Sequence, residues 1–372
     1  MKREAFGRVR QCLGAVLLIV LAAACAQERS LGPKPVGGRV YISAGGFDPQ
    51  IYVIDVETDS LIDSIPIPID AGPPQIVCDR DVPRFAAWGG SRTYGTMFFN
   101  AGEHTPFLRA DSGGSQAIRG FDASRGLLVA TGGAVGVGAT SPARTLIRRF
   151  PSLEVILRDT VGVNQGIVFR RQGLIAGLVD YADEYNSWVG SKLGMYDYVN
   201  HRLTKLVAVG DRPDSNSIFR LGGHPNARWF YLTVPTHAGP RLIGYDISQE
   251  RELFRVPIVG LVGEPEVTPD GKEVWYPDGG VPGVILERIT IYDASTGVLL
   301  DSVKFTDWRE LGGAQWPVQV RFSSDGKKAY TCSGGLAGAG MFLIDVKSRS
   351  VTKAWYRPHR FPQYLDIGPS PG

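Results

Sequence analysis

The chain has 372 residues, of which 43% are hydrophobic and 21% are charged, with 47 Gly, 25 Pro and four Cys. This length suits two average domains or one large all-β ring, and the hydrophobic content excludes a disordered chain. Four cysteines are too few for a disulfide scaffold. The formal net charge of +3 hints at an anionic partner until the charges are placed along the chain.

The first 24 residues are typical of a signal peptide. Four basic residues lie within the first ten positions, and an apolar run of 13 residues follows over 12–24. At about 1.5 Å per residue this run is too short for a hydrocarbon core of roughly 30 Å, but it suits a signal-peptide core. Small residues then lead into Cys25, which resembles a bacterial lipobox, where the Cys is lipidated and becomes the mature N-terminus. Leu21 lies four residues before Cys25 instead of the usual three, so ordinary cleavage after Ala24 or Ala26 stays open.

These features predict an exported protein with three parts. Residues 1–24 are the signal peptide, residues 25–37 are the lipidated Cys25 and a flexible tether, and residues 38–372 are the folded part. Ala26 favours the outer membrane over the inner one, and we expect the protein in the periplasm or at the outer membrane. Loss of residues 1–24 removes four basic residues and one acidic residue, which leaves 36 of each sign. The net charge of +3 therefore belongs to the signal, and no nucleic-acid partner is predicted.

From residue 38 onwards one unit recurs, an alternating apolar strand followed by a polar tight turn and a second strand. The segments IYVIDVETDSLIDSI (51–65) and RITIYDASTGVLLDSV (288–303) are clear copies. Seven turn-opening residues recur 45 to 52 positions apart: Asp55, Asn100, Arg149, Asp197, Asp246, Asp293 and Asp345. The period-two alternation excludes helical repeats and predicts β-hairpins. We interpret the repeated Asp as structural, because a short carboxylate accepts a hydrogen bond from the backbone two residues further on.

A second motif lies between these hairpins, a short strand that follows proline or a small residue and precedes a turn and another strand. Its seven copies are PPQIVCD (73–79), QAIRGFD (116–122), QGIVFR (165–170), NSIFRL (216–221), EPEVTPD (264–270), WPVQVRF (316–322) and FPQYLDI (361–367). Each unit therefore holds four short strands in about 48 residues. Seven such units predict an all-β fold, a seven-bladed β-propeller with four antiparallel strands per blade.

The two ends of the folded part are expected to share one blade. The segment GRVYISAGG (38–46) matches the second strand of a unit, and FPQYLDIGPS (361–370) matches a first strand. Pairing between them would complete a blade, close the ring and remove a free sheet edge.

These units resemble the YVTN-type repeat of seven-bladed propellers, a WD40-like group that includes lactonase-like proteins and many bacterial surface and periplasmic proteins. The resemblance rests on IYVIDVETDSLIDSIPI (51–67), ITIYDASTGVLLDSV (289–303) and the Pro-led inner strands, and it covers about 330 residues. It implies an architecture and no particular reaction, since one fold hosts many functions.

In a propeller, the first strand of each blade lines the central channel, and the loops between second and third strands open on one face. These loops vary in length here, which marks their face as the expected binding face. Residues just before the inner strands would form a partial ring of amides, a carboxylate and aromatics at the channel mouth, suited to a small polar ligand. These candidates are Gln116, Gln165, Asn216, Glu264, Trp316 and Phe361. They could equally be solvated loop residues or plugs of the channel.

Loop 180–192 gathers acidic and aromatic residues and is a candidate contact surface for a partner protein. Its candidate contact residues are Asp180, Asp183, Glu184, Tyr185 and Trp188. Such a density of carboxylates could bind Ca²⁺, but the spacing lacks the alternation and the Gly of a calcium loop, so no metal site is predicted. A loop that is merely solvated stays open as an alternative.

Catalytic motifs are absent from the sequence. It contains no nucleophile elbow, phosphate-binding loop or haem-attachment motif, and its five His lack the spacing of a zinc site. The best-placed candidates are Glu264, His237, Arg241 and Arg144, although the acid–base residues of lactonase-like proteins cannot be matched to this chain. Two further residues, Cys78 and Cys332, are expected on blades two positions apart, as separate buried thiols.

The sequence therefore predicts a lipid-anchored propeller of the cell envelope, a monomer without a cofactor or chemistry of its own. It would bind an envelope protein or a small polar ligand on the channel-mouth face. One alternative is a lactonase-like hydrolase, and another is a propeller subunit of a periplasmic redox enzyme.

Overall fold

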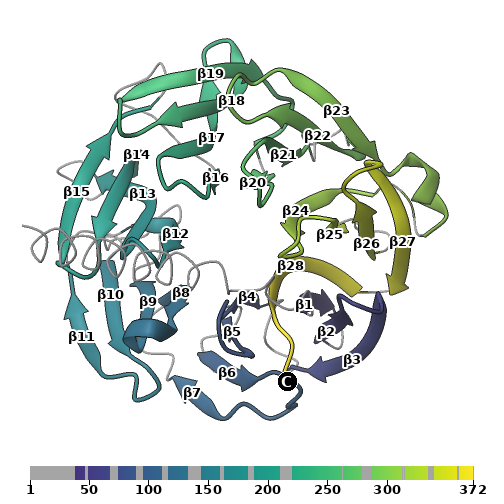
Figure 1. Ribbon diagram of the computed structural model, residues 1–372, viewed down its shortest axis with the longest axis horizontal. Coiled ribbons are helices and arrows are strands. Elements are labelled where there is room, and N and C mark those ends of the chain that lie inside the picture. The colour runs from purple at the N-terminus through teal and green to yellow at the C-terminus, as the bar shows by residue number, and fades with distance from the viewer. Residues whose placement is uncertain are drawn as a thin grey trace, which may run out of the picture. The chain divides into compact units, whose positions relative to one another are not determined.

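A computed structural model of the protein describes residues 38–46, 49–67, 74–88, 95–110, 116–132, 144–159, 163–182, 188–209, 220–261, 263–278, 286–311, 313, 315–333, 339–357 and 360–371. The predictions for Cys25 and the rest of residues 1–37 lie outside these segments. The described strands form seven four-stranded antiparallel sheets arranged in a ring (Figure 1). The predicted seven-bladed β-propeller is confirmed. No helix in the described segments is long and apolar enough to cross a membrane.

Each blade runs from an inner strand near the ring axis to an outer strand at the periphery (Figure 1). The closing blade contains β28 (Arg360–Pro369), β1 (Gly38–Gly46), β2 (Gln50–Asp55) and β3 (Ser60–Pro66). The next three blades contain β4 (Gln75–Cys78), β5 (Arg84–Trp88), β6 (Thr96–Asn100) and β7 (Leu108–Ala110); β8 (Gln116–Asp122), β9 (Leu127–Gly132), β10 (Arg144–Arg149) and β11 (Val155–Arg158); and β12 (Asn164–Phe169), β13 (Leu174–Ala182), β14 (Trp188–Asp197) and β15 (Arg202–Val207). The last three contain β16 (Arg220–Gly223), β17 (Trp229–Thr236), β18 (Gly239–Asp246) and β19 (Arg251–Pro257); β20 (Glu266–Val267), β21 (Glu273–Pro277), β22 (Arg288–Asp293) and β23 (Leu299–Lys304); and β24 (Pro317–Phe322), β25 (Lys328–Ser333), β26 (Ala339–Asp345) and β27 (Ser350–Arg357).

Four details refine the predicted units. The inner strand expected over 216–221 continues to Gly223, and its described part starts at Arg220. The hairpin turns have nearly one length, except that residues 101–107 separate β6 from β7. The short 3₁₀ helix Thr306–Leu311 between β23 and β24 accounts for the longest spacing in the repeat. A second 3₁₀ helix, Ala123–Arg125, joins β8 to β9.

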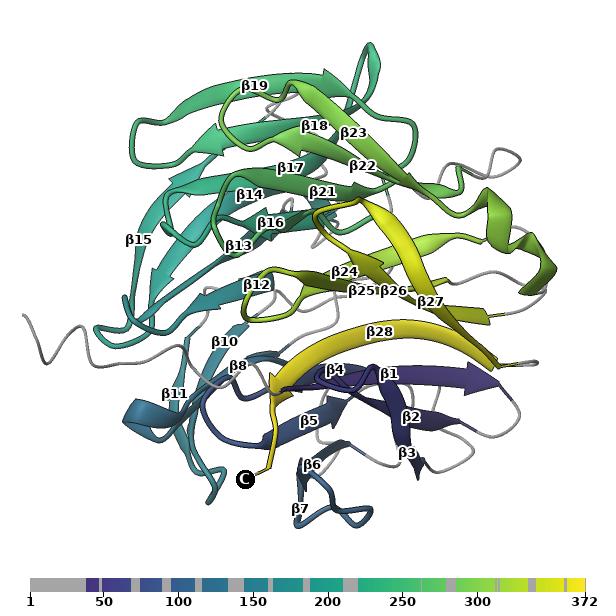
Figure 2. The ribbon, with the colours of Figure 1, turned by 45° about the vertical axis from the view of Figure 1, so that its right-hand side comes forward.

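The termini close the ring as expected. Strand β28 pairs antiparallel with β1 from Gly38 opposite Pro369 to Gly46 opposite Arg360. Figure 2 shows β28, in yellow, running along the purple β1. Strand β28, the last of the chain, is therefore the inner strand of the closing blade. Its pairing covers the edge of β1 that would otherwise be free.

The hydrophobic core lies between neighbouring blades, because both faces of each sheet are covered. On β1, the buried Val40 and Ile42 belong to a cluster with Cys332 and Met341 of the last blade. The intervening Tyr41 points to the other face and packs with Phe85 of the next blade, with ring centroids 4.3 Å apart. Alternate residues of one strand thus serve two interfaces, as the two-residue period of a strand requires.

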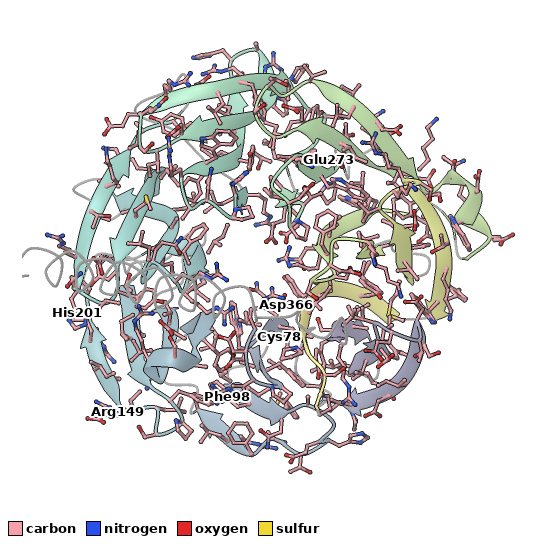
Figure 3. The ribbon with its side chains drawn as sticks, viewed as in Figure 1. Cys78, Phe98, Arg149, His201, Glu273 and Asp366 are labelled. Atoms are coloured by element: carbon pink, nitrogen blue, oxygen red, sulfur yellow. The ribbon has the colours of Figure 1, made fainter. Side chains whose placement is uncertain are left out.

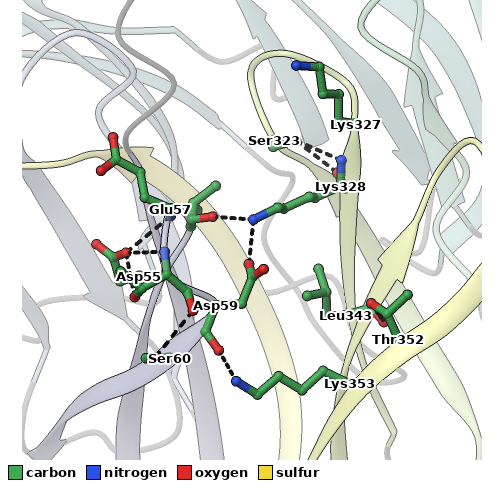
Figure 4. A network of polar contacts seen from close by, with 12 residues as sticks. Asp55, Glu57, Asp59, Ser60, Ser323, Lys327, Lys328, Leu343, Thr352 and Lys353 are labelled. Carbon is green, nitrogen blue, oxygen red and sulfur yellow. Dashed lines mark hydrogen bonds and ion pairs between the residues drawn. The ribbon is translucent and has the colours of Figure 1, made fainter.

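Polar contacts also join the closing blade to the last blade (Figure 4). The Nζ of Lys328 lies 2.7 Å from Asp59 Oδ1 and donates to the Val56 carbonyl at 2.7 Å. The ammonium of Lys353 donates to the Asp59 carbonyl, and the hydroxyl of Tyr330 donates to Asp59 Oδ1 at 3.2 Å. Asp59 adopts a positive φ of 52° in the β2–β3 turn, where this backbone region is tolerated by Asp. One turn residue therefore receives three groups from the neighbouring blade.

The repeated turn Asp has the structural role that the sequence predicts. The Oδ1 of Asp293 accepts from the backbone N–H of Ser295 at 3.0 Å and of Thr296 at 2.8 Å. The equivalent carboxylates of Asp55, Asp197 and Asp246 accept from the same two relative positions. The hydroxyls of Ser295 and Thr296 also donate to Asp293 Oδ1, and these side-chain bonds, followed by the backbone bonds, lower the pKa of Asp293 because they stabilise the ionised carboxylate.

Candidate functional site

Inner strands of four consecutive blades gather charged and amide side chains near the ring axis. Strands β20, β24, β28 and β4 follow one another around the ring (Figure 1). The group, called here the axial cluster, consists of Glu264, Glu266, Gln319, Arg321, Asp366 and Arg80. Glu264 and Glu266 are two residues apart, as are Gln319 and Arg321, so the period of a strand places each pair on one face.

Arg321 is the centre of the axial cluster. Its two terminal nitrogens donate to different carboxylates, to Glu264 Oε1 at 2.9 Å and to Glu266 Oε2 at 3.0 Å. Its Nε lies 3.8 Å from Asp366 Oδ1 on the neighbouring inner strand. The planar guanidinium presents donors in several directions, so one side chain can bridge three carboxylates where a lysine would act as a point charge.

Amide and backbone groups complete the network. Gln319 donates from Nε2 to Glu264 Oε2 at 2.6 Å, and its Oε1 accepts from the backbone N–H of Leu365 at 3.1 Å. Asp366 accepts from Arg80 at 2.5 Å and from the backbone N–H of Cys78 at 2.8 Å. Figure 3 shows Asp366 and Cys78 on the inner side of the ring, whereas Arg149 and His201 lie at its periphery. The network thus joins the last strand of the chain to the blades on both sides of it.

The two glutamates have different protonation behaviour. Burial alone would raise the pKa of Glu264, but the charge and hydrogen bond of Arg321 outweigh burial, and the pKa is lowered. Burial raises the pKa of Glu266 to about 7, because the attraction of Arg321 is too weak to offset it and Glu264 adds a like charge. Near neutral pH, Glu264 is therefore ionised and Glu266 exchanges a proton with solvent, which reaches 30% of its side chain.

Two further arginines act on the same region from other blades. Arg119 lies on β8, and the charge of Glu264 raises its pKa. Arg220 begins β16, and its charge lowers the pKa of Glu264. The guanidinium carbon of Arg119 lies 5.8 Å from the ring centroid of Trp88, within the range of a cation–π contact. Burial lowers the pKa of Arg119 to about 10, although the charge of Glu264 acts in the opposite direction.

Two of the predicted channel-mouth residues lie just before adjacent inner strands. Glu264 precedes β20 and Trp316 precedes β24, at the same end of adjacent inner strands, and the Glu264 N–H points to the Val318 carbonyl at 3.5 Å. Gln116, Gln165 and Phe361 lie on β8, β12 and β28, with only their backbones described. Asn216 lies outside the described residues.

The proposed catalytic candidates occupy different places. His237 is exposed in the β17–β18 turn, and the Arg241 guanidinium donates to the carbonyls of Pro240 and Ala238 in that turn. Glu264 belongs to the axial cluster, where Arg321 and Gln319 hold it. Arg144 begins β10, with only its backbone described. Arg241 and Glu264 therefore make their hydrogen bonds to different partners, and no described bond joins them.

The loop predicted over 180–192 is shorter than expected, because residues 180–182 end β13 and residues 188–192 begin β14, where antiparallel pairing extends both strands. Asp180 lies near the end of β13 and Trp188 begins β14, and these strands pair up to Ala182 opposite Trp188. Asp183, Glu184 and Tyr185 lie outside the described residues. Within the described segments, no three His, Cys, Asp or Glu side chains are grouped so that they could hold a metal ion.

The two thiols of the folded part are separate, as predicted. Cys78 and Cys332 are both free and buried. They lie on β4 and β25, on either side of the closing blade. Burial raises the pKa of both thiols, so they behave as packing residues in the core.

Most of the axial cluster was not among the residues singled out from the sequence. The missed members are Glu266, Gln319, Arg321, Asp366 and Arg80. The neighbouring Arg119 and Arg220 were missed as well. A usable signal was present, because polar residues at alternate positions of otherwise apolar inner strands must face the ring axis or a neighbouring blade. Their pairing was hidden, since Arg321 and Glu264 are 57 residues apart.

Comparisons with known proteins support the fold and leave the function open. No protein-family model matches the chain, and no curated protein matches it. Among solved structures, a hypothetical selenium-binding protein from Sulfolobus tokodaii has a TM-score of 0.67 at 10% identity, covering 88% of this chain and 93% of that one. A functionally unknown protein from Desulfotomaculum acetoxidans has a TM-score of 0.58 at 15% identity, covering 86% and 96%. Hydrazine synthase from Kuenenia stuttgartiensis has a TM-score of 0.56 at 11% identity, covering 83% and 90%. At these identities the chain shares the propeller fold alone with each of them.

Proposed function

We propose that this protein is a non-catalytic binding module of the cell envelope, built from YVTN-type repeats and anchored by lipid at Cys25. It would hold an envelope protein or a small polar ligand on the face where second and third strands are joined. The anchor is supported by the basic start, the short apolar run and the small residues before Cys25.

The state of Glu264 is the observation that carries the binding role. This residue belongs to both the predicted ligand ring and the predicted catalytic set. Its carboxylate is ionised, and it is bonded to Arg321 and Gln319, with a lowered pKa. A carboxylate stabilised in this way is a weak base, whereas a general base works best with a pKa near the working pH. Glu264 therefore suits the positioning of other charges better than proton abstraction.

The anchor and the binding role are tested separately. Cys25→Ala should shift the protein from the membrane fraction to the soluble exported fraction, and mass spectrometry should find acyl chains on Cys25 of the wild type. An unmodified N-terminus in the membrane fraction would contradict the anchor.

For binding, the purified folded part would be used as bait in envelope extract, and the captured protein would then be purified and titrated. Replacing loop 180–192 by a Gly-Ser segment of equal length should abolish this interaction. Glu57→Ser, on the exposed β2–β3 turn, is the control and should leave it unchanged. If wild type, the loop replacement and Glu57→Ser bind with equal affinity, the contact lies outside the loop. If wild type shows no saturable binding to any envelope component, the binding role is contradicted.

Glu266 favours a second candidate, the lactonase-like hydrolase. Two carboxyl groups whose pKa values are pushed in opposite directions are a frequent acid–base arrangement, and burial raises the pKa of Glu266 to about 7. Under this hypothesis wild type turns over a panel of lactones, and Glu266→Gln, Glu264→Gln and His237→Ala each remove most of that turnover. Absence of turnover by wild type excludes the hydrolase for that panel. The redox-subunit alternative has no support from a described residue, since the likeness to hydrazine synthase concerns the fold.

A further inference from the structure

We propose that β28, the strand that closes the ring, is a latch whose local opening is controlled by the protonation of Glu266. The protonated residue holds β28 in place, and the ionised residue loosens β28 from the blades on both sides. This inference goes beyond the proposed binding function, because it concerns how the ring is held closed and not what the protein binds.

The first support is the set of side chains that hold β28 from its two neighbouring blades. From β24, Gln319 Oε1 accepts from the Leu365 N–H at 3.1 Å. On the same strand, Arg321 Nε lies 3.8 Å from Asp366 Oδ1. From the opposite side, Arg80, which follows β4, donates to Asp366 at 2.5 Å. The axial cluster therefore contacts the middle of β28 from both sides.

The second support is the balance of charge among these contacts. They join three carboxylates to two guanidinium groups: Glu264, Glu266, Asp366, Arg80 and Arg321. If all three carboxylates are ionised, negative charge exceeds positive charge by one among these five groups, and one protonation restores the balance. Asp366 is the carboxylate of the three that lies on β28, so the excess charge acts on the closing strand.

The third support is that Glu266 is held less firmly than the other two carboxylates. Glu264 accepts on both oxygens, from Arg321 at 2.9 Å and from Gln319 at 2.6 Å. Asp366 also accepts on both oxygens. Glu266, by contrast, accepts a single described bond, from Arg321 at 3.0 Å. Hydrogen bonds to the ionised form favour ionisation, so Glu266 is the carboxylate that takes the proton.

The groups that face Glu266 set the direction of the pH effect. They are Arg321 on β24, Glu264 before β20, Arg80 after β4 and Asp366 on β28, and Arg220 on β16 acts on Glu264 beside it. When pH rises through about 7, Glu266 becomes ionised, attracts Arg321 and repels Asp366. Opening of β28 carries Asp366 away and admits water to Glu266. Opening is therefore favoured as pH rises, and closure is favoured as pH falls.

The two buried thiols provide a reporter of this opening. Cys78 on β4 packs against β28, since a Cβ on Gly368 would lie 3.4 Å from its sulfur. Cys332 on β25 belongs to the cluster that contains Leu365 and Ile367 of β28. Departure of β28 therefore uncovers both thiols, one on each side.

The test measures hydrogen exchange of the purified full-length chain at pH 6 and pH 8 by mass spectrometry, with each rate divided by the intrinsic rate at the same pH. We expect the protection of β28 to fall about tenfold at pH 8, the factor for a pKa of about 7 in the closed state and 4.5 in the open state. Strands β13 and β14, three blades away, should keep their protection. Iodoacetamide labelling of Cys78 and Cys332, relative to the unfolded chain at the same pH, should rise by a similar factor.

Glu266→Gln cannot ionise, and its β28 should be as protected at pH 8 as that of wild type at pH 6. Glu57→Gln, on the exposed β2–β3 turn of the same blade, is the matched control and should behave like wild type. Equal loss of protection in β28 and in β13 and β14 of wild type would overturn the latch, whether or not the variant folds. A wild-type pH dependence in Glu266→Gln would overturn the role of Glu266. Neither outcome affects binding through loop 180–192, so this proposal and the proposed function fail separately.

Discussion

The hairpin turns and the axial cluster use the same residue type in opposite ways. Asp293 at a hairpin turn bonds to its own backbone two and three residues away, and equivalents recur in most blades. Asp366 in the axial cluster occurs once and bonds to Arg80 and to the Cys78 N–H, almost 290 positions away in the chain. A carboxylate that bonds to neighbours in the sequence can recur in every blade. A carboxylate that bonds to residues far away in the sequence belongs to one site only.

This contrast predicts that the stability of the ring depends most on contacts between distant segments. Deleting residues 361–372 removes nearly all of β28, the inner strand of the closing blade, together with Asp366. It exposes the edge of β1 and opens the ring. We expect a loss of more than about 5 kcal/mol in the free energy of unfolding, comparable with the whole stability of a typical domain. The measurement is urea unfolding followed by circular dichroism.

A chain that ends at residue 369 is the control for this deletion, because it keeps all of β28. It should unfold like the full folded part. If the longer deletion unfolds at the same urea concentration as the control, ring closure by β28 does not stabilise the protein.

The next largest effect is expected at Arg321. Arg321→Met leaves Glu264, Glu266 and Asp366 facing one another without their shared cation. Removing the shared cation of this partly exposed network should cost about 2–3 kcal/mol, between the cost for an exposed ion pair and that for a fully buried one, because the remaining carboxylates stay partly desolvated. The free energy of unfolding at pH 7 measures this loss.

Arg349 offers a matched comparison at the periphery. It also bridges two carboxylates, Glu273 at 2.6 Å and Asp301 at 3.3 Å, but Asp301 is 52% exposed. Arg349→Met should cost about 1 kcal/mol or less, since solvent screens exposed ion pairs. If Arg321→Met and Arg349→Met lose equal free energy of unfolding, a position near the ring axis does not make an ionic network more stabilising.

The architecture could be predicted from the sequence because its determinants are local. Alternation over 51–65 and Asp at the turn specify a hairpin within 15 residues, and seven copies specify the number of blades. The joined termini followed from counting strands in the first and last segments. The axial cluster could not be derived in this way, since it depends on which inner strands become neighbours and on the burial of each side chain. Glu264 was singled out by its position before a strand, but its partner Arg321 was not.

The pH dependence of stability separates the two glutamates of the axial cluster. The folded state raises the pKa of Glu266 from 4.5 to about 7, so the folded protein binds more protons than the unfolded chain between these values. The stability contributed by this group is fully present below pH 4.5 and is lost as pH rises through about 7. Because 30% of the side chain is exposed, solvent screening reduces the effect to about 1–2 kcal/mol.

Glu266→Gln cannot ionise and should remove this loss. The free energy of unfolding of the variant, relative to wild type, should rise by about 1–2 kcal/mol between pH 5 and pH 8. Glu57→Gln, on the exposed β2–β3 turn, should follow the wild-type profile. Parallel profiles of Glu266→Gln and wild type would show that Glu266 has an ordinary pKa in the folded state.

A small effect, similar to that at Arg349, is expected at a single hairpin turn. Asp293→Ala removes a carboxylate that accepts two backbone N–H groups and two hydroxyls, all within three residues. These donors are exposed and can bond to water instead, so the expected loss is about 1 kcal/mol. Asp293→Asn keeps an acceptor oxygen and should lose less. A loss at Asp293 as large as that at Arg321 would contradict the contrast between the two regions, because it would give a repeated local bond the weight of a unique long-range one.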